Sequence, residues 1–162
     1  MSLMKGKIRA ICISEQRGTA KHAIESAELV QNFGIKNDAH AGNWHRQVSL
    51  LAYEKVSEFN ARGGNVQNGD FGENILLEGI DLRKLPVGSI LKNENIVLKI
   101  SQIGKECHSH CQIFHRVGDC IMPREGVFAT VETGGTIMVG DELELVLPSV
   151  DAPFRAAVMT LS

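Results

Sequence analysis

The side chains best suited to chemistry are concentrated in one stretch of the sequence, residues 100–128. Three of the four cysteines and three of the six histidines lie in it: Cys107, Cys111, Cys120, His108, His110 and His115. A cysteine thiolate is a nucleophile and a soft metal ligand, and nearby cations lower the pKa of its thiol. Lys105 lies just before Cys107 in the sequence, and His108 follows it directly. The stretch therefore predicts the reactive site of the protein.

Three kinds of site fit this cysteine-rich stretch. A structural zinc site is the first, because cysteine and histidine are the usual zinc ligands. The spacing of the cysteines argues against zinc. A second Cys-x-x-Cys knuckle is missing, and the gap from Cys111 to Cys120 completes no common zinc finger or zinc ribbon. A reactive or metal-ligating thiolate is the second. Half-buried cysteines with polar residues near a turn, and no chemistry, are the third. The residues alone leave all three open.

A second polar stretch, residues 34–47, surrounds two glycines and the single tryptophan, Trp44, with four candidate ligand-binding side chains: Asp38, His40, His45 and Arg46. Glycine lets the backbone approach a ligand closely, and these side chains supply hydrogen-bond donors and acceptors. An ordinary polar loop anchored by Trp44 is the alternative. Glu73, between two strand-mouth residues Gly72 and Asn74, is a further candidate, with a solvated surface carboxylate as its alternative.

Composition narrows the class of protein. A chain of 162 residues is long enough for one domain with a buried core, which we place at residues 5–147, followed by a tail at 148–162. The net charge of −2 disfavours nucleic acid and anionic membranes as partners. No apolar run reaches membrane-spanning length, no signal peptide is recognisable, and the unevenly spaced cysteines favour free thiols in the cytoplasm. Residues 1–3 resemble a cloning remnant, with Met4 as a candidate native start.

Hydrophobic patterning predicts a mostly β protein of α+β type. Short apolar runs bounded by glycine turns indicate strands at 7–14, 47–51, 75–77, 96–103, 126–131 and 142–147. Cys12 lies in the first of them and is expected to be a buried core residue. Short helices are expected at 53–61, with Val56 and Phe59 inward, and around 107–116, whereas residues 23–33 fit either type of element. Many short strands and few helices favour a closed or semi-closed β-barrel.

Several segments together resemble the MOSC domain family, named after the C-terminal domain of molybdenum cofactor sulfurase. The similarity is greatest to its small stand-alone bacterial members. The matching segments occur in family order and cover most of residues 7–146: GIKNDAHAGNWHRQVSLLA (34–52), GDFGENILLEGIDL (69–82), VGSIL (87–91), LKISQIGKEC (98–107) and MPREGVFATVETGGTIMVGDELEL (122–145). The resemblance implies a MOSC-type β-barrel that carries a cysteine able to bind sulfur or to ligate molybdenum.

The resemblance also assigns roles to the candidate residues. The family's cysteine follows a strand by a few residues, and this register points to Cys107 as the catalytic residue. Cys111 and Cys120 are then candidates for further metal ligands or for a resolving thiol. A molybdopterin-type ligand combines a phosphate, a polar pterin and a soft metal centre. Arg46 or Arg124 would bind the phosphate, with His40 and His45 beside it. Asp38 or Glu73 would accept hydrogen bonds from the edge of the pterin, and the soft metal centre suits a thiolate.

These roles imply a protein of molybdenum cofactor metabolism, a molybdopterin binder or a sulfur carrier. Any catalysis would be sulfur transfer to the cofactor, or the work of one component of a cofactor-dependent oxidoreductase. No lysine lies in a motif for binding pyridoxal phosphate, so any sulfur must come from elsewhere. The alternative is a structural module, with zinc or without metal, that partners a cofactor-synthesis enzyme.

Overall fold

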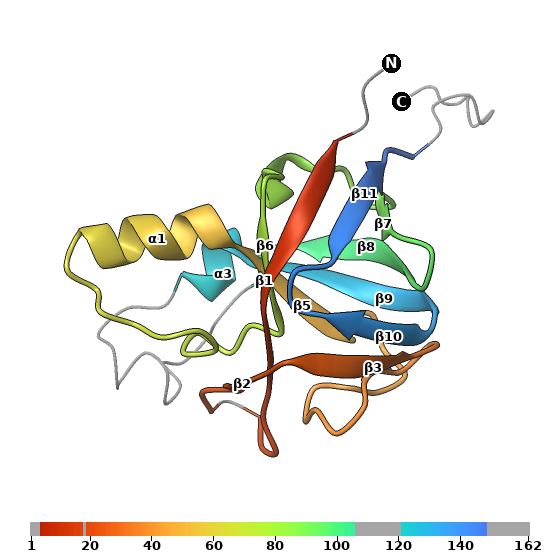
Figure 1. Cartoon of the computed structure of the whole chain (residues 1–162), viewed down its shortest axis with the longest axis horizontal. Coiled ribbons are helices and arrows are strands. Elements are labelled where there is room, and N and C mark those ends of the chain that lie inside the picture. The colour runs from red at the N-terminus through yellow and green to blue at the C-terminus, as the bar shows by residue number, and fades with distance from the viewer. Residues whose placement is uncertain (1–3, 18, 106–120, 149–162) are drawn as a thin grey trace.

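Seven strands close into a β-barrel in the computed structural model, which describes residues 4–17, 19–105 and 121–148 (Figure 1). Around the barrel the strands follow the order β11-β7-β8-β9-β5-β6-β1, and β1 pairs with β11 to complete the ring. Their bounds are β1 (Lys5–Ile13), β5 (Val48–Ala52), β6 (Ile75–Glu78), β7 (Ile90–Lys92), β8 (Val97–Ile103), β9 (Val127–Thr133) and β11 (Glu142–Val146). The predicted mostly β barrel is confirmed.

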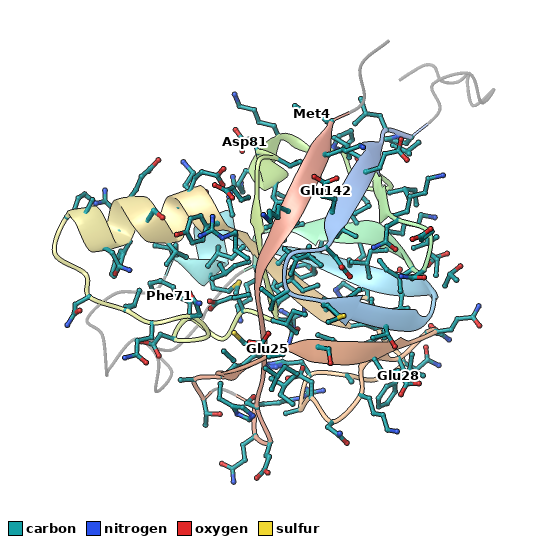
Figure 2. All side chains as sticks on the ribbon, in the orientation of Figure 1. Met4, Glu25, Glu28, Phe71, Asp81 and Glu142 are labelled. Atoms are coloured by element: carbon teal, nitrogen blue, oxygen red, sulfur yellow. The ribbon has the colours of Figure 1, made fainter. Side chains whose placement is uncertain are left out.

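One helix joins the two parallel strands of this otherwise antiparallel barrel. β5 and β6 pair in parallel, and α1 (Tyr53–Ala61) makes part of the crossover between them on the outside of the barrel (Figure 1). Val56 and Phe59 are buried, as the sequence predicts. The ring of Phe71 meets that of Phe59 edge to face, with centroids 5.1 Å apart, and Phe71 lies beside α1 in Figure 2. The helix predicted at residues 53–61 is confirmed.

The core has two layers because several strands are covered on both faces. One face of each strand points into the barrel, where Ile11, Leu50 and Ile75 pack together. The opposite face packs beneath α1, and it includes Leu51 and Cys12. Strands covered on both sides contain continuous apolar runs instead of alternation. Cys12 is fully buried, and burial raises the pKa of its thiol to about 12, which confirms it as a core residue.

A smaller sheet lies against the barrel, with the strand order β10-β3-β4. It comprises β3 (Ser26–Val30), β4 (Gly34–Ile35) and β10 (Gly135–Met138), while β2 (His22–Ile24) pairs with β1. Residues 23–33, which fit either type of element in the sequence, thus contribute to β2 and β3. Gly134 and Gly135 allow a close crossing, because a Cβ on either would lie 2.6 Å from a carbonyl oxygen of another strand or turn. The sequence predicts only a turn at these glycines, and β10 is not recognisable from it.

The remaining described helices are short. η1 (Leu82–Lys84) is a single 3-10 turn, and α3 (Met122–Glu125) is a single α-helical turn directly before β9. No helix among the described residues is long and apolar enough to cross a membrane. The helix predicted around residues 107–116 lies outside the described residues, as does most of the tail.

The turn at Asn68 and Gly69 joins the barrel to the segment before β2. Gly69 has a φ of +90°, and its carbonyl oxygen accepts a hydrogen bond from the backbone N–H of Lys21 at 2.8 Å. A Cβ at this position would lie 2.2 Å from the carbonyl oxygen of Lys21. Glycine is therefore required here both by the backbone conformation and by the close packing of two chain segments.

A pair of alanine substitutions separates these two requirements. Gly63 has a φ of +97°, and a Cβ at this position would meet no atom within 4 Å, so Gly63→Ala should cost only the conformational strain, about 1 kcal/mol. Gly69→Ala adds a backbone clash and should lower the free energy of unfolding by about 2 kcal/mol more. Urea unfolding of both variants measures the difference. Equal losses would show that the Gly69–Lys21 packing is unimportant.

Candidate functional site

The loop between β4 and β5, residues 36–47, lies against the ends of three barrel strands. Asp38 Oδ1 accepts a hydrogen bond from the backbone N–H of Ser14, just beyond β1, at 3.1 Å. His45 Nε2 lies 2.7 Å from Gln102 Oε1 on β8. The guanidinium carbon of Arg46 lies 5.5 Å from the ring centroid of Phe128 on β9. Four predicted site residues, Asp38, His40, His45 and Arg46, are therefore brought to one end of the barrel.

A buried ion pair holds this loop. Lys21 Nζ lies 2.7 Å from Asp38 Oδ1, and both side chains are completely inaccessible to solvent. Lys21 Nζ also lies 3.1 Å from Ser14 Oγ and 3.0 Å from His40 Nδ1. The second carboxylate oxygen of Asp38 accepts a hydrogen bond from the backbone N–H of His40 at 3.1 Å. Charges taken out of water are tolerated only when partners satisfy them, and these partners do so.

His40 is held neutral by its surroundings. Burial, followed by the positive charge of Lys21, lowers the pKa of its imidazole to about 4, although Asp38 opposes this effect. Weaker contributions that lower the pKa come from Arg17 and Lys105. The influence of Lys105 shows that the chain leaving β8 passes near His40. Residues Cys107 to Cys120 begin shortly afterwards in the sequence.

Two arginines stack on the single tryptophan. The guanidinium carbons of Arg17 and Arg46 lie 4.9 and 4.6 Å from the ring centroid of Trp44. Trp44 Nε1 donates a hydrogen bond to the carbonyl oxygen of His40 at 2.9 Å, which fixes the ring. The Nε of Arg46 is shielded from solvent and has no hydrogen-bond partner in the described structure. Such an unsatisfied donor is rare in proteins.

Three basic side chains, those of Arg17, Arg46 and Lys105, form a basic group around Trp44 and His40. Arg17, Arg46 and Lys105 make no ion pair with an acidic side chain in the part of the chain that the structure describes. Asp38 is neutralised by Lys21, so it does not compensate them. A basic group of side chains on a protein of net charge −2 is a local attraction for anions.

Glu73 lies behind this surface instead of on it. Its side chain is fully buried, and its carboxylate accepts hydrogen bonds from the backbone N–H groups of Gly69 at 2.7 Å and Phe71 at 3.1 Å. Burial raises the pKa of Glu73 to about 7 despite these two bonds. A solvated surface carboxylate, the alternative considered from the sequence, is therefore excluded. Glu73 stabilises the turn whose Gly69 carbonyl holds the backbone of Lys21.

The described residues on either side of the cysteine-containing segment are held together by backbone hydrogen bonds. The backbone N–H of Gly104 donates to the carbonyl oxygen of Gly126 at 2.7 Å, and Ile103 pairs with Val127 between β8 and β9. Arg124, on α3 and exposed, lies just before this closure. Cys107, Cys111 and Cys120 lie outside the described residues, so the predictions that they are catalytic or metal-ligating stay predictions. Among the described residues, no group of three or more histidine, cysteine or acidic side chains could hold a metal ion.

The residues that organise the site are not recognisable in the sequence. Lys21 and Arg17 lie in a polar segment around Gly18 that looks like an ordinary loop. No local pattern marks a lysine that will be buried, because its partner Asp38 is 17 positions away in the sequence. The sequence predicts Trp44 only as an anchor, whereas in the structure it also supports both arginines.

The family of the chain follows from comparison with known proteins. A family model described as the MOSC domain matches residues 37–144, from the site loop into β11. The chain belongs to the MOSC domain family. This confirms the resemblance found in the sequence. None of the curated proteins compared with the chain matches it.

Solved structures share this MOSC fold at low sequence identity. The YUAD protein from Bacillus subtilis superimposes with a TM-score of 0.76 and 19% identity, covering 91% of this chain and 99% of that one. YiiM from Geobacillus stearothermophilus gives a TM-score of 0.65 at 18% identity, covering 91% and 77%. YiiM from Escherichia coli gives 0.65 at 18%, covering 91% and 72%. Similarity at this level shows the fold alone.

The pKa of Glu73 predicts how stability depends on pH. Between its ordinary value of 4.5 and about 7, the folded protein keeps Glu73 protonated while the unfolded chain does not. The contribution of Glu73 to the free energy of unfolding therefore falls as pH rises through this window. Glu73→Gln should flatten that part of the profile, measured by urea unfolding at several pH values, whereas the exposed control Glu58→Gln should leave it unchanged. An unaltered profile in Glu73→Gln would contradict the assignment.

Proposed function

We propose that this end of the barrel binds a molybdopterin-type cofactor and that Cys107 binds sulfur or ligates molybdenum there. Membership of the MOSC family supports a link to this cofactor. The observation that carries the proposal is the group of basic side chains Arg17, Arg46 and Lys105, which make no ion pair with an acidic side chain in the described part of the chain, with both guanidinium groups stacked on Trp44. An oxyanion of the ligand would be attracted to this group.

The residues present fit the parts of such a cofactor. Arg46 and Arg17 can form charge-assisted hydrogen bonds with a phosphate, and the guanidinium fork suits this geometry. His40 and His45 lie on the same loop and can contact the polar ring system. Arg124 follows the cysteine-containing segment and is proposed as a second cation for the phosphate. Asp38 and Glu73, whose carboxylates accept internal hydrogen bonds, support the loop and the turn behind the ligand.

The proposed role of Cys107 follows from its place in the sequence. Lys105 influences His40 electrostatically, and Cys107 is the second residue after Lys105 in the sequence. The molybdenum centre, when bound, supplies a soft acceptor for thiolate or sulfide. As a sulfur carrier, the thiolate of Cys107 would attack the outer sulfur of a donor protein's persulfide. The donor leaves as a thiolate, and Cys107 becomes a persulfide.

Arg46 provides the first test of this proposal. Arg46→Ala should weaken binding of molybdopterin by about 10- to 100-fold, the usual loss for one hydrogen bond to a charged group, as measured by fluorescence quenching of Trp44. Arg83→Ala, which removes an exposed arginine on η1, is the control and should bind normally. Unchanged affinity in Arg46→Ala would exclude this loop as the binding site.

Cysteine labelling provides the second test. Brief treatment of the native protein with iodoacetamide should label Cys107 before Cys12, because Cys12 is fully buried and its pKa is raised to about 12. Cys107→Ala should abolish persulfide formation, detected by mass spectrometry, and leave the fold intact. Persulfide formation that depends on Cys111 or Cys120 instead would move the site to that residue. Stoichiometric zinc that is lost in Cys107→Ala and Cys111→Ala would favour the structural module.

A further inference from the structure

The hydrogen bonds of Lys21 define the state of His40. An ammonium group has three N–H donors and no acceptor. Three acceptors surround Lys21 Nζ: Asp38 Oδ1 at 2.7 Å, His40 Nδ1 at 3.0 Å and Ser14 Oγ at 3.1 Å. Each donor therefore has one acceptor, and His40 Nδ1 must offer its lone pair. A proton on Nδ1 would point at the ammonium group and break the arrangement.

The same geometry determines what His40 can offer a ligand. A neutral imidazole carries one proton, and with Nδ1 occupied as an acceptor that proton is on Nε2. We propose that Lys21 is a positioning residue that fixes His40 as a neutral Nε2–H donor, so that His40 recognises an oxyanion of the ligand and does not ligate a metal ion. The part about the ligand rests on the proposed function of this site, and the part about the tautomer does not.

The charged groups around His40 support the same conclusion. Lys21, Arg17 and Lys105 all disfavour a positive charge on the ring, and among the charged groups that act on it Asp38 alone favours one. A metal cation would meet the same three positive side chains. An anion would be attracted by them and would accept the Nε2 proton in a hydrogen bond. A pKa of about 4 also keeps the donor unchanged across the range from pH 5 to pH 8.

Histidine NMR of the free protein tests the tautomer directly. The ¹⁵N shifts of the ring should show a protonated Nε2 and an unprotonated Nδ1 for His40, with no titration between pH 5 and pH 8, given a pKa of about 4. A proton on Nδ1, or titration within this range, would overturn the inference. The result requires no ligand, so it stands apart from the proposed function.

Two variants show whether Lys21 is responsible. Lys21→Met/Asp38→Asn removes both buried charges together, which avoids leaving one of them unpaired. In this variant the proton of His40 should no longer be confined to Nε2, whereas Lys36→Met, which removes an exposed lysine from the same region of the sequence, should leave the His40 signals unchanged. If the double variant does not fold, the wild-type tautomer still decides the question. A folded double variant in which His40 still carries its proton only on Nε2 would exclude Lys21 as the cause.

Sulfate and zinc serve as probes of ligand preference. Sulfate stays fully ionised between pH 5 and pH 8, so its binding reports only on the protein. Sulfate should shift the Nε2 signal of His40 in the wild type with an affinity that changes less than twofold from pH 5.5 to pH 7.5. Zinc should leave the His40 signal unchanged.

The outcomes separate this inference from the proposed function. Zinc binding at His40, or no effect of sulfate on Nε2, would overturn the role of His40 as an oxyanion donor. If sulfate binds as expected but molybdopterin does not bind, the proposed function is wrong. The assigned roles of Lys21 and His40 would still hold.

Discussion

The burial of Lys21 with Asp38 is the interaction on which the candidate site depends. Two charges withdrawn from water cost several kcal/mol each, and the cost is met only when every donor and acceptor is satisfied. Here Ser14 and His40 complete the set, so the end of β1 and the loop before β5 are held in one arrangement. A single coupled network therefore positions the loop that carries Arg46.

A second buried acid extends this network away from the surface. Glu73 stabilises the turn that contacts the backbone of Lys21, and the same turn lies against Cys12 in the outer core layer. The requirement on this turn is geometric, because it must pass within hydrogen-bonding distance of Lys21 without a side chain at Gly69. The packing of the core and the position of the site are thus linked through backbone contacts, not through charge alone.

The sequence predicted those parts of the structure that depend on local periodicity. The apolar run at 96–103 gave β8, in which Leu98 and Ile100 are buried, and the inward positions of Val56 and Phe59 gave the inner face of α1. The sequence could not predict β10, because Gly134 and Gly135 look like an ordinary turn. In the structure these glycines allow segments that are distant in the sequence to cross closely. The sequence also could not predict the burial of Lys21 or of Glu73, since both depend on partners that only the folded chain brings near. The site loop was recognisable by composition, whereas its internal hydrogen bonds were not.

The pairing of β1 with β11 has a consequence for synthesis of the chain. Lys5 lies opposite Glu144, so the ring is closed by segments from nearly opposite ends of the described chain. β1 emerges from the ribosome first and β11 last among the barrel strands. Until β11 arrives, the edges of β1 and β7 that it will cover have no partner, and open strand edges promote association between chains. A nascent chain that stops before β11 therefore leaves both of these strand edges open.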